Sequence, residues 1–339
     1  MGRETPYKIG LLGSGSWATA LAKLLTGKGY TIHWWIRQPE HIRYLKQHRH
    51  HPRYLSAVHF DLRKLIFYES AAELVARTDL ILVCLPSAFL KAVLDTLPPS
   101  AFRDRYVVSA VKGMVGETHQ LLNDFLEDRF GLPQEQYFNI TGPCHAEEVA
   151  AEKLSYLTVC GKDRAVLERI APHFSTPYLQ TVLSTDVRGT QYAAVLKNIY
   201  ALGAGMAHGL GYGDNFLAVY IANCALEMSR FNTAVCGTQE EEAAPQLLSS
   251  AYLGDLLVTC YSSYSRNRRF GNMIGKGYSV RAAQIEMDMV AEGYEAARSV
   301  YLLNREIAAP MPVATALYQV LWEHGHPLEC FTSLEKKFF

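Results

Sequence analysis

The chain has 339 residues, of which 49% are hydrophobic and 19% are charged. This composition is typical of a globular protein and excludes a disordered chain, and the length predicts two domains. The 33 basic and 33 acidic residues give a net charge of +0. Because such a chain has no general attraction to nucleic acid or to an anionic membrane, we expect neither as a partner. Any bound anion must be held by a local site.

The cysteines and apolar stretches indicate a compartment. The seven cysteines are scattered without a CxxC pair, which favours a reducing environment over a disulfide framework or a zinc site. No stretch approaches about 18 unbroken apolar residues, and MGRETPYKIGLLG lacks the apolar region of a signal peptide. We therefore expect a cytoplasmic protein without membrane insertion. The histidines of HRHHPRYL (His48, His50 and His51) have no carboxylate or thiolate ligands nearby, so no metal site is expected.

The first half alternates strand-like and helical stretches. Apolar, β-rich runs predict strands at 7–12, 31–36, 66–68, 80–85, 106–110 and 138–141. Helical spacing predicts helices at 16–25, 71–76 and 118–130. Strands that alternate with helices imply parallel pairing and a sheet covered on both faces. We therefore predict a doubly wound, Rossmann-like α/β domain over residues 1–187.

The second half is dominated by helical spacing. Such spacing runs from 186 to 230, with an interruption around Gly209, Gly211 and Gly213, and returns in later segments at 243–250, 280–285, 292–306 and 312–322. The best strand-like run is 156–159. These patterns predict a mostly α-helical, substrate-binding and catalytic domain over residues 188–339.

A glycine motif follows the first predicted strand. In GSGSWA, Gly13, Gly15 and Ala18 fit a GxGxxA frame between a strand and a helix. There the first glycine permits a tight turn, the second lets the backbone approach a pyrophosphate, and the helix N-terminus attracts the phosphates. This context favours dinucleotide binding over a glycine turn without a ligand.

The residue at the end of the second predicted strand bears on the choice of cofactor. An NAD site usually has Asp or Glu there to bind the ribose 2′-hydroxyl, whereas this chain has Arg37 and no acid before Glu40. A guanidinium binds a 2′-phosphate that a carboxylate would repel. We therefore favour NADPH, with NADH as the alternative cofactor; the other interpretation of Arg37 is an exposed arginine at a strand end.

Two lysines are candidates for the chemistry. Lys112 lies just past a strand end, where ligands bind in open α/β sheets, although it is equally interpreted as a solvated surface charge. Lys197 lies mid-helix among apolar neighbours, so its ammonium either reaches the surface or is held in a cleft. In a cleft near a second cation its pKa would fall, and it could exchange protons near neutral pH.

Three further features of the second half are candidates for the site, and the basic segment among them suggests that an anion binds there. Asp255 lies in a Gly–Asp turn near a predicted helix start, and SRNRR concentrates donors suited to a phosphate monoester at Ser265, Arg266 and Asn267. Such a basic loop is otherwise a solvated surface. Glu292 lies at another predicted helix start, where a carboxylate also serves as a capping charge.

Seven blocks of sequence occur in the order found in one family. They are GSGSWATALA, VSAVKGM, TGPCHAEEVA, LKNIYALGAGMAHGLGYGDN, LGDLLVTC, SRNRRFG and VAEGYEAA, and they span roughly residues 8–300. In these blocks the chain resembles bacterial soluble NAD(P)-dependent glycerol-3-phosphate dehydrogenase. The resemblance implies reversible reduction of dihydroxyacetone phosphate by NADPH to sn-glycerol 3-phosphate, for glycerophospholipid synthesis, by an enzyme that forms a homodimer.

The resemblance also implies roles for individual residues. Lys197 would donate and accept the proton, assisted by Lys112 and Asp255. The expected substrate-binding residues are Lys112, Gly142, Cys144, Lys197, Asp255, Ser265, Arg266 and Asn267. The expected cofactor-binding residues are Gly13, Gly15, Ser16, Trp17, Arg37, Tyr54, Lys112, Ala146, Arg266, Val290 and Glu292.

The chain departs from the family pattern at three positions. Cys144 stands where the family usually has Ser, which weakens a hydroxyl donor, and Tyr261 and Tyr264 are larger than usual and would narrow the pocket. Two other functions stay open. One is a related hydroxyacid or sugar-nucleotide dehydrogenase, the latter with Cys260 as its nucleophile; the other is a non-catalytic sensor that binds NADPH.

Overall fold

The computed structural model describes residues 7–237, 246–287 and 291–338. Its sheet has the strand order β3-β2-β1-β4-β5-β6-β7-β8, which confirms the predicted Rossmann-like architecture. The strands are β1 (Ile9–Leu12), β2 (Ile32–Trp35), β3 (Leu65–Tyr68), β4 (Leu80–Val83), β5 (Tyr106–Ser109), β6 (Tyr137–Thr141), β7 (Ser155–Gly161) and β8 (Leu179–Ser184).

The sheet differs from the prediction at one end. The first six strands, β1 to β6, pair in parallel with their neighbours in the sheet, but β7 pairs antiparallel to β6. The connection between them contains a helix of only 5 residues, which packs beside α1, and the chain then turns back along the sheet. The strand β8 was not predicted because its sequence, LQTVLS, is not a continuous apolar run, and much of it is exposed at the sheet edge.

Helices cover both faces of the sheet. Leu11 of β1 packs into a core cluster with the apolar side of α1, while its neighbour Leu12 packs into a second cluster on the opposite face. The helices of this part are α1 (Ser16–Gly27), α2 (Pro39–His48), α3 (Ala71–Ala76), α4 (Ser87–Leu94), α5 (Leu122–Phe130), α6 (Ala146–Ala150) and α7 (Arg164–Ile170). Four short 3₁₀ turns are η1 (Leu62–Lys64), η2 (Gly116–Thr118), η3 (Gln134–Gln136) and η4 (Ala171–His173).

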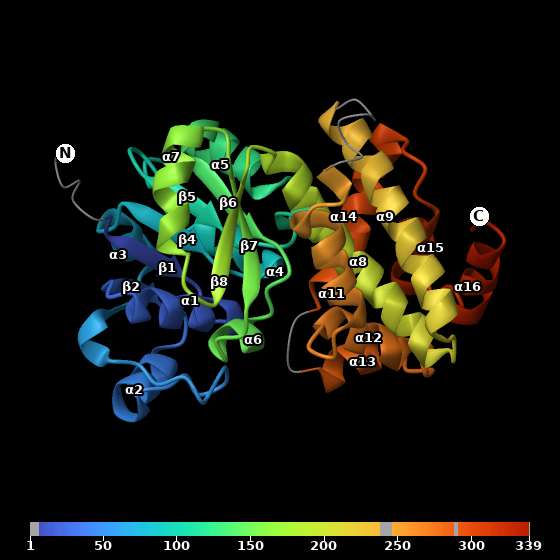
Figure 1. Ribbon diagram of the computed structural model, residues 1–339, viewed down its shortest axis with the longest axis horizontal. Coiled ribbons are helices and arrows are strands. Elements are labelled where there is room, and N and C mark those ends of the chain that lie inside the picture. Colours follow the sequence, from blue (N-terminus) through green and yellow to red (C-terminus); the bar gives the residue numbers. More distant parts are fainter. Residues whose placement is uncertain (1–6, 238–245, 288–290, 339) are drawn as a thin grey trace.

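The rest of the described chain is helical and lies beside the sheet (Figure 1). Its helices are α8 (Val187–Gly209), α9 (Asp214–Cys236), α11 (Asp255–Tyr261), α12 (Arg266–Gly275), α13 (Val280–Glu286), α14 (Glu292–Ile307), α15 (Pro312–Trp322) and α16 (Pro327–Glu335), with a π-helical turn, η5 (Ser250–Gly254), before α11. The predicted helix at 243–250 falls partly on residues outside the described part. Division of the chain after residue 187, where α8 starts, stays a prediction.

Among the helices that were not predicted are α2, α4 and α7 beside the sheet and α12 and α16 in the helical part. The α12 helix begins inside the basic SRNRR segment, because the Ser265 hydroxyl accepts a hydrogen bond from the backbone N–H of Arg268 and so caps the first turn. The α16 helix begins with a proline at its first position, which is compatible with a helix start.

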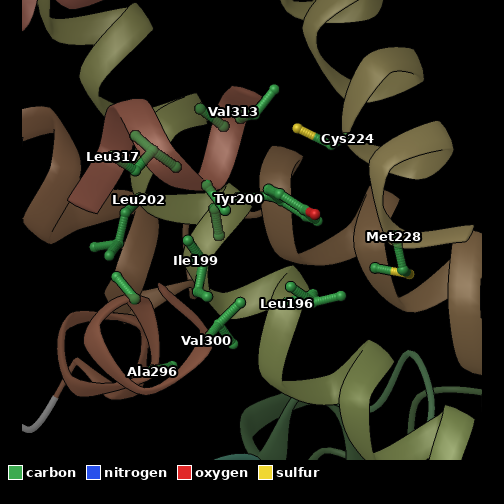
Figure 2. Close-up of a cluster of buried hydrophobic side chains, with 14 of the residues drawn as sticks. Leu196, Ile199, Tyr200, Leu202, Cys224, Met228, Ala296, Val300, Val313 and Leu317 are labelled. Atoms are coloured by element: carbon green, nitrogen blue, oxygen red, sulfur yellow. The ribbon is translucent and has the colours of Figure 1, made fainter. Parts of the chain in front are cut away.

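The central helix of this part is α8, which is buried along nearly its whole length. In Figure 2 its side chains meet those of α9, α14 and α15 in one apolar cluster. One carboxylate lies in this core: Glu227 of α9 accepts hydrogen bonds from the backbone N–H groups of Val313 and Ala314, 2.7 and 2.8 Å away, and from the Tyr200 hydroxyl. It thereby caps the N-terminus of α15.

Glycines bring α8 and α12 into backbone contact. A Cβ added to Gly205 would lie 2.0 Å from the Arg268 carbonyl oxygen, and one added to Gly271 would lie 1.9 Å from that of Leu202. Neither position therefore has room for a side chain. The two helices that carry Lys197 and Arg266 are consequently held at a fixed, close separation.

Candidate active site

The glycine loop after β1 is shaped to receive an anion. Gly13 has φ +120°, and a Cβ there would lie 2.3 Å from the Cys84 carbonyl oxygen, so only glycine fits. Around Gly15 a Cβ would meet nothing within 4 Å, so the loop is open on this side. The α1 helix that follows has no side-chain cap and no acid in its first turn. Its first N–H groups are therefore available to a pyrophosphate, and the loop fits a dinucleotide.

A cleft opens from this loop towards the helical part of the molecule. It has a cavity volume of about 200 Å³. The side chains that line it come from both halves of the chain. They include Ser16, Trp17, Lys112, Cys144, His145, Ala146, Lys197, Asn198, Thr259, Tyr264, Ser265, Arg266, Asn267 and Glu292.

Lys197 and Asp255 form a buried ion pair in this cleft. Lys197 is 4% exposed and Asp255 is 1% exposed; the ammonium donates to Oδ1 of Asp255 and to the Thr259 hydroxyl, which is 3.2 Å away. The other carboxylate oxygen, Oδ2, accepts from the backbone N–H of Gly142 at 3.3 Å. The ammonium and both carboxylate oxygens thus have hydrogen-bond partners, which fix the orientation of the two side chains.

The protonation of Lys197 is adjusted by its surroundings. Burial lowers the pKa of its ammonium from 10.5 to about 8, and the positive charge of Lys112 acts in the same direction, while Asp255 opposes both. An amine with a pKa near 8 is populated in both forms close to neutral pH. Lys197 can therefore donate a proton or accept one.

Two asparagines connect the lysines to the arginine-bearing helix. The Asn198 amide donates to the Lys112 carbonyl oxygen at 3.0 Å. Its own oxygen accepts from the Asn267 amide at 2.9 Å, and Oδ1 of Asn267 accepts from the backbone N–H of Gly293 at 2.9 Å. This chain of bonds joins α8, α12, α14 and the segment after β5.

The α12 helix presents a guanidinium to the glycine loop. Nη2 of Arg266 donates to the hydroxyl of Ser16 at 2.6 Å, although the two residues are 250 positions apart in sequence. The arginine therefore lies at the N-terminus of α1 as well as at that of α12. Both helix ends and the guanidinium favour a negatively charged ligand between them.

Glu292 joins the start of α14 to the start of α4. Its carboxylate accepts from the backbone N–H of Ser87 at 3.1 Å and from the Ser87 hydroxyl. Burial raises the pKa of this carboxyl, against the hydrogen bonds from Ser87 and the charge of Arg266. A Cβ added to Gly113 would lie 2.8 Å from Oε2 of Glu292, so the chain passes very close to this contact.

Family models match nearly the whole chain. The N-terminal model of NAD-dependent glycerol-3-phosphate dehydrogenase matches residues 8–167, and the C-terminal model matches residues 186–332. The chain belongs to the NAD-dependent glycerol-3-phosphate dehydrogenase family. This confirms the resemblance stated from the sequence blocks.

Individual relatives agree with this membership. The glycerol-3-phosphate dehydrogenase [NAD(P)+] of Chlorobium chlorochromatii is 35% identical over 318 residues, 93% of each chain. That of Streptococcus pneumoniae is 34% identical over 321 residues, 94% of this chain and 92% of its own. The crystal structure of glycerol-3-phosphate dehydrogenase from Coxiella burnetii superposes with a TM-score of 0.89 at 27% identity and covers 97% of this chain and 98% of its own.

The residues expected from the family resemblance fall into three places. Most line the cleft, while Gly13, Arg37 and Tyr54 line a second cavity that shares Gly15, Ser16 and Arg266 with it. Asp255 and Gly142 lie behind Lys197 and reach the cleft through its ammonium. Val290 is outside the described residues. The roles of all these residues in this member of the family stay predictions.

The three departures from the family pattern have different structural settings. The thiol of Cys144 donates to the Tyr156 carbonyl oxygen at 2.9 Å, and burial raises its pKa to about 12. Tyr264 lines the cleft, whereas Tyr261 is not among the residues that line it. The cleft is therefore narrowed by one tyrosine rather than two.

The cysteine required by the sugar-nucleotide alternative is poorly suited to catalysis. Cys260 is fully buried, and burial raises the pKa of its thiol to about 12. It does not line the cleft. Since the thiolate is the reactive form of cysteine, this side chain lacks both the ionisation and the access that a nucleophile needs.

Sequence reasoning missed three residues of this site. Thr259 lies one helical turn after Asp255, and Ser87 follows the end of β4, where ligand-binding residues collect in such sheets; both positions carried a usable signal. His145 was not among the expected site residues. Its pKa is lowered to about 4, by burial and then by Lys112 and Lys197, and its Nε2 has no partner in the described structure.

The described residues contain neither a helix that could span a membrane nor a group of side chains that could hold a metal ion. None of the described helices is long and apolar enough to cross a membrane. Within the same residues, no three histidine, cysteine, aspartate or glutamate side chains come together in a group that could hold a metal ion.

Proposed function

We propose that this chain catalyses the reversible transfer of hydride between NADPH and dihydroxyacetone phosphate, giving sn-glycerol 3-phosphate, with NADH as an alternative cofactor. The observation that carries the proposal is the buried Lys197–Asp255 pair, which lies in a cleft reached from the glycine loop on one side and from Arg266 on the other. Membership of the glycerol-3-phosphate dehydrogenase family supports the same reaction.

Lys197 is the proton donor for reduction and the proton acceptor for oxidation. The bound nicotinamide supplies or receives the hydride. As the substrate carbonyl gains it, negative charge develops on oxygen, and the Lys197 ammonium donates a proton there. Asp255 orients the ammonium, and Lys112 adds positive charge that lowers the pKa of Lys197 and stabilises the developing alkoxide. The reverse reaction uses the neutral amine as base.

The phosphate end of the substrate is bound at α12. Arg266, the first residue of this helix, supplies a forked guanidinium, and the helix N-terminus adds partial positive charge. The Ser265 hydroxyl caps the helix and the Asn267 amide is bonded to Asn198, so these two residues position the phosphate site as well as line it. Phosphate binding then holds the carbonyl against Lys197.

The cofactor lies along the glycine loop. Gly13, Gly15 and the start of α1 at Ser16 and Trp17 receive its pyrophosphate, and Arg37 with Tyr54 receives the adenosine end. Ala146 and Glu292 line the cleft at the nicotinamide end. These two residues come from opposite halves of the chain, so a bound nicotinamide would be contacted from both.

Absorbance at 340 nm tests the function directly. Purified protein is mixed with dihydroxyacetone phosphate and either NADPH or NADH. Rapid loss of absorbance with NADPH and slower loss with NADH supports both the reaction and the role of Arg37. Equal rates of absorbance loss with both cofactors would support the reaction but contradict the preference for NADPH that is inferred from Arg37. Binding of NADPH without turnover would contradict the enzymatic function and favour the alternative of a non-catalytic sensor that binds NADPH.

We further propose a cytoplasmic homodimer that supplies glycerol 3-phosphate for glycerophospholipid synthesis. Family membership and the scattered, unpaired cysteines support this setting. Light scattering coupled to size-exclusion chromatography tests the oligomeric state: a mass of about twice 38.0 kDa supports the dimer, and a mass near 38.0 kDa contradicts it.

A further inference from the structure

We propose that Arg53 is a second residue that recognises the 2′-phosphate of NADP(H), so that an arginine pair, Arg37 with Arg53, selects the phosphorylated cofactor. This inference rests on the proposed function, because it concerns the cofactor of that reaction. It names a specificity-determining residue that neither the glycine motif nor the end of the second strand indicated.

The first step is the cavity that the two arginines share. It extends from the glycine loop past the end of β2, has a volume of about 250 Å³, and is lined by Arg37 and Arg53 together with Gln38, His41 and Tyr54. A third arginine, Arg266, lines it at the glycine loop, where it contacts Ser16. Arg37 and Arg53 are both exposed to solvent, so an anion can reach them from the cavity.

The second step is the charge of this cavity. Its lining contains no aspartate or glutamate. Among the described residues, no carboxylate forms an ion pair with either Arg37 or Arg53. Arg37 and Arg53 at one end of the cavity, with Arg266 at the glycine loop, create a strongly positive potential. A phosphate monoester with a charge close to −2 is the complement of the pair formed by Arg37 and Arg53. The 2′-hydroxyl of NAD(H) carries no charge and offers one neutral acceptor oxygen in place of the charged phosphate oxygens.

The third step is the way both arginines are held. The Arg37 guanidinium lies over the ring of Phe89, 4.6 Å from its centroid, which leaves the edge of the fork free to donate. Arg53 is held through its backbone: Nδ1 of His51 accepts from the N–H of Arg53 at 3.1 Å and from that of Tyr54 at 3.2 Å. His51 is completely buried, so this anchor is not exposed to competing water.

The protonation of His51 matches this role. Burial lowers the pKa of its imidazole to about 4, and the nearby charges of His41, Arg53 and His50 act in the same direction. The ring is therefore neutral at neutral pH, and Nδ1 keeps the lone pair that the two N–H groups need. His51 is thus a positioning residue for Arg53.

Equilibrium binding of NADP+ and NAD+ to the full chain, measured by titration calorimetry without substrate, tests the role of Arg53. Arg53→Ala is expected to weaken NADP+ roughly 10- to 100-fold, the effect of losing a charge-assisted hydrogen bond, and to change NAD+ less than about twofold. Arg53→Lys keeps the charge without the fork and falls between. Arg43→Ala removes a charge from the exposed surface of α2, outside the cavity, and is the matched control with no expected change.

Two results would overturn the proposal: unchanged NADP+ binding by Arg53→Ala, or equal weakening of NADP+ and NAD+. The binding titrations involve no turnover, so they test the role of Arg53 independently of the 340 nm assay, which tests the proposed function. A wild-type chain that prefers NADP+ but leaves dihydroxyacetone phosphate unreduced removes the reaction and keeps the arginine pair.

Variants of His51 test the positioning role. His51→Ala removes the acceptor and is expected to lower the ratio of NADP+ to NAD+ affinity, whereas His51→Asn places an oxygen near the position of Nδ1 and is expected to restore most of that ratio. A merely structural role would weaken both cofactors alike and leave the ratio unchanged, which would contradict the positioning by His51. If His51→Ala does not fold, His51→Asn and the Arg53 series still decide the question.

Discussion

The side-chain amide of Asn267 donates to that of Asn198 across a distance of 2.9 Å. Each asparagine directly follows a residue with a proposed role in the reaction, since Asn198 comes after Lys197 and Asn267 after Arg266. The bond therefore fixes the position of α8, which carries Lys197, relative to α12, which carries Arg266. Both amides are buried, so the tie is not weakened by water.

Asn267→Ala tests this tie. The change leaves the oxygen of Asn198 and the N–H of Gly293 without partners, and we expect the free energy of unfolding to fall by about 2 to 4 kcal/mol. We also expect kcat/KM for dihydroxyacetone phosphate to fall at least about tenfold, since a 1 Å misplacement has effects of that order or larger. Chemical denaturation and the 340 nm assay measure the two effects. Asn223→Ala, whose amide bonds to Val219 on its own helix, is the control. Lost stability with unchanged kcat/KM would contradict the link to catalysis.

The pH dependence of turnover should reflect Lys197, whose pKa is about 8. Reduction needs the protonated amine, so kcat/KM at saturating NADPH should be level below pH 8 and fall about tenfold per pH unit above it. Oxidation needs the neutral amine and should rise up to pH 8 and then level off. Lys197→Arg keeps the charge but loses the titration, and it should lower kcat by roughly 10²- to 10⁴-fold. Identical profiles for wild type and this variant would remove Lys197 from proton transfer.

Two glycines on either side of Met114 give a matched pair of substitutions. A Cβ on Gly113 would meet Ser87 at 2.5 Å and Glu292 at 2.8 Å, whereas a Cβ on Gly116 would meet nothing within 4 Å. Gly113→Ala should therefore displace the Ser87–Glu292 contact and destabilise the fold by about 1 to 3 kcal/mol, the usual range for overpacking. Gly116→Ala should leave the melting temperature close to that of wild type. Equal effects of the two substitutions on calorimetric melting would show that the contact does not constrain Gly113.

The buried carboxyl of Glu227 should make stability depend on pH. Burial raises its pKa to about 7, against the hydrogen bonds from Ala314, Val313 and Tyr200. Between its unfolded pKa near 4.5 and about 7, the folded state binds more protons than the unfolded state, so this group's contribution to stability is present below pH 4.5 and is lost as pH rises through 7. The loss is on the order of 3 kcal/mol. Glu227→Gln has no such titration, so its unfolding free energy relative to wild type should rise across this window. A difference independent of pH would contradict the raised pKa.

The strands β1 to β6 could be predicted because they are continuous apolar runs, with a glycine motif after the first of them, whereas α2, α4 and α7 between them were not predicted. The edge strand β8 could not be predicted, because it is partly exposed and its sequence, LQTVLS, therefore has no clear apolar pattern. Nor could the antiparallel pairing of β7, because strand direction depends on where α6 packs and not on the composition of either strand.

The candidate site shows the same division. Lys197 was conspicuous as a lysine among apolar neighbours, and Arg37 as an arginine where an acid is usual. The partner of Lys197 was not visible from the residues alone, because Asp255 is 58 positions away and reaches it only through packing of α11 on α8. Arg53 gave no signal at all: its place depends on a loop held by a buried histidine.

The close approach of α8 and α12 at their glycines means that the distance from Lys197, the proposed proton donor, to the proposed phosphate site at Arg266 is set by two backbones and not by flexible side chains. The separation of the two helices is therefore fixed. A substrate whose carbonyl is one carbon further from its phosphate could not be accommodated by a change of rotamer, because the helices that would have to separate are already in contact over their carbonyl groups. The proposed roles of Lys197 and Arg266 therefore imply that the packing of the two helices selects for a three-carbon phosphate.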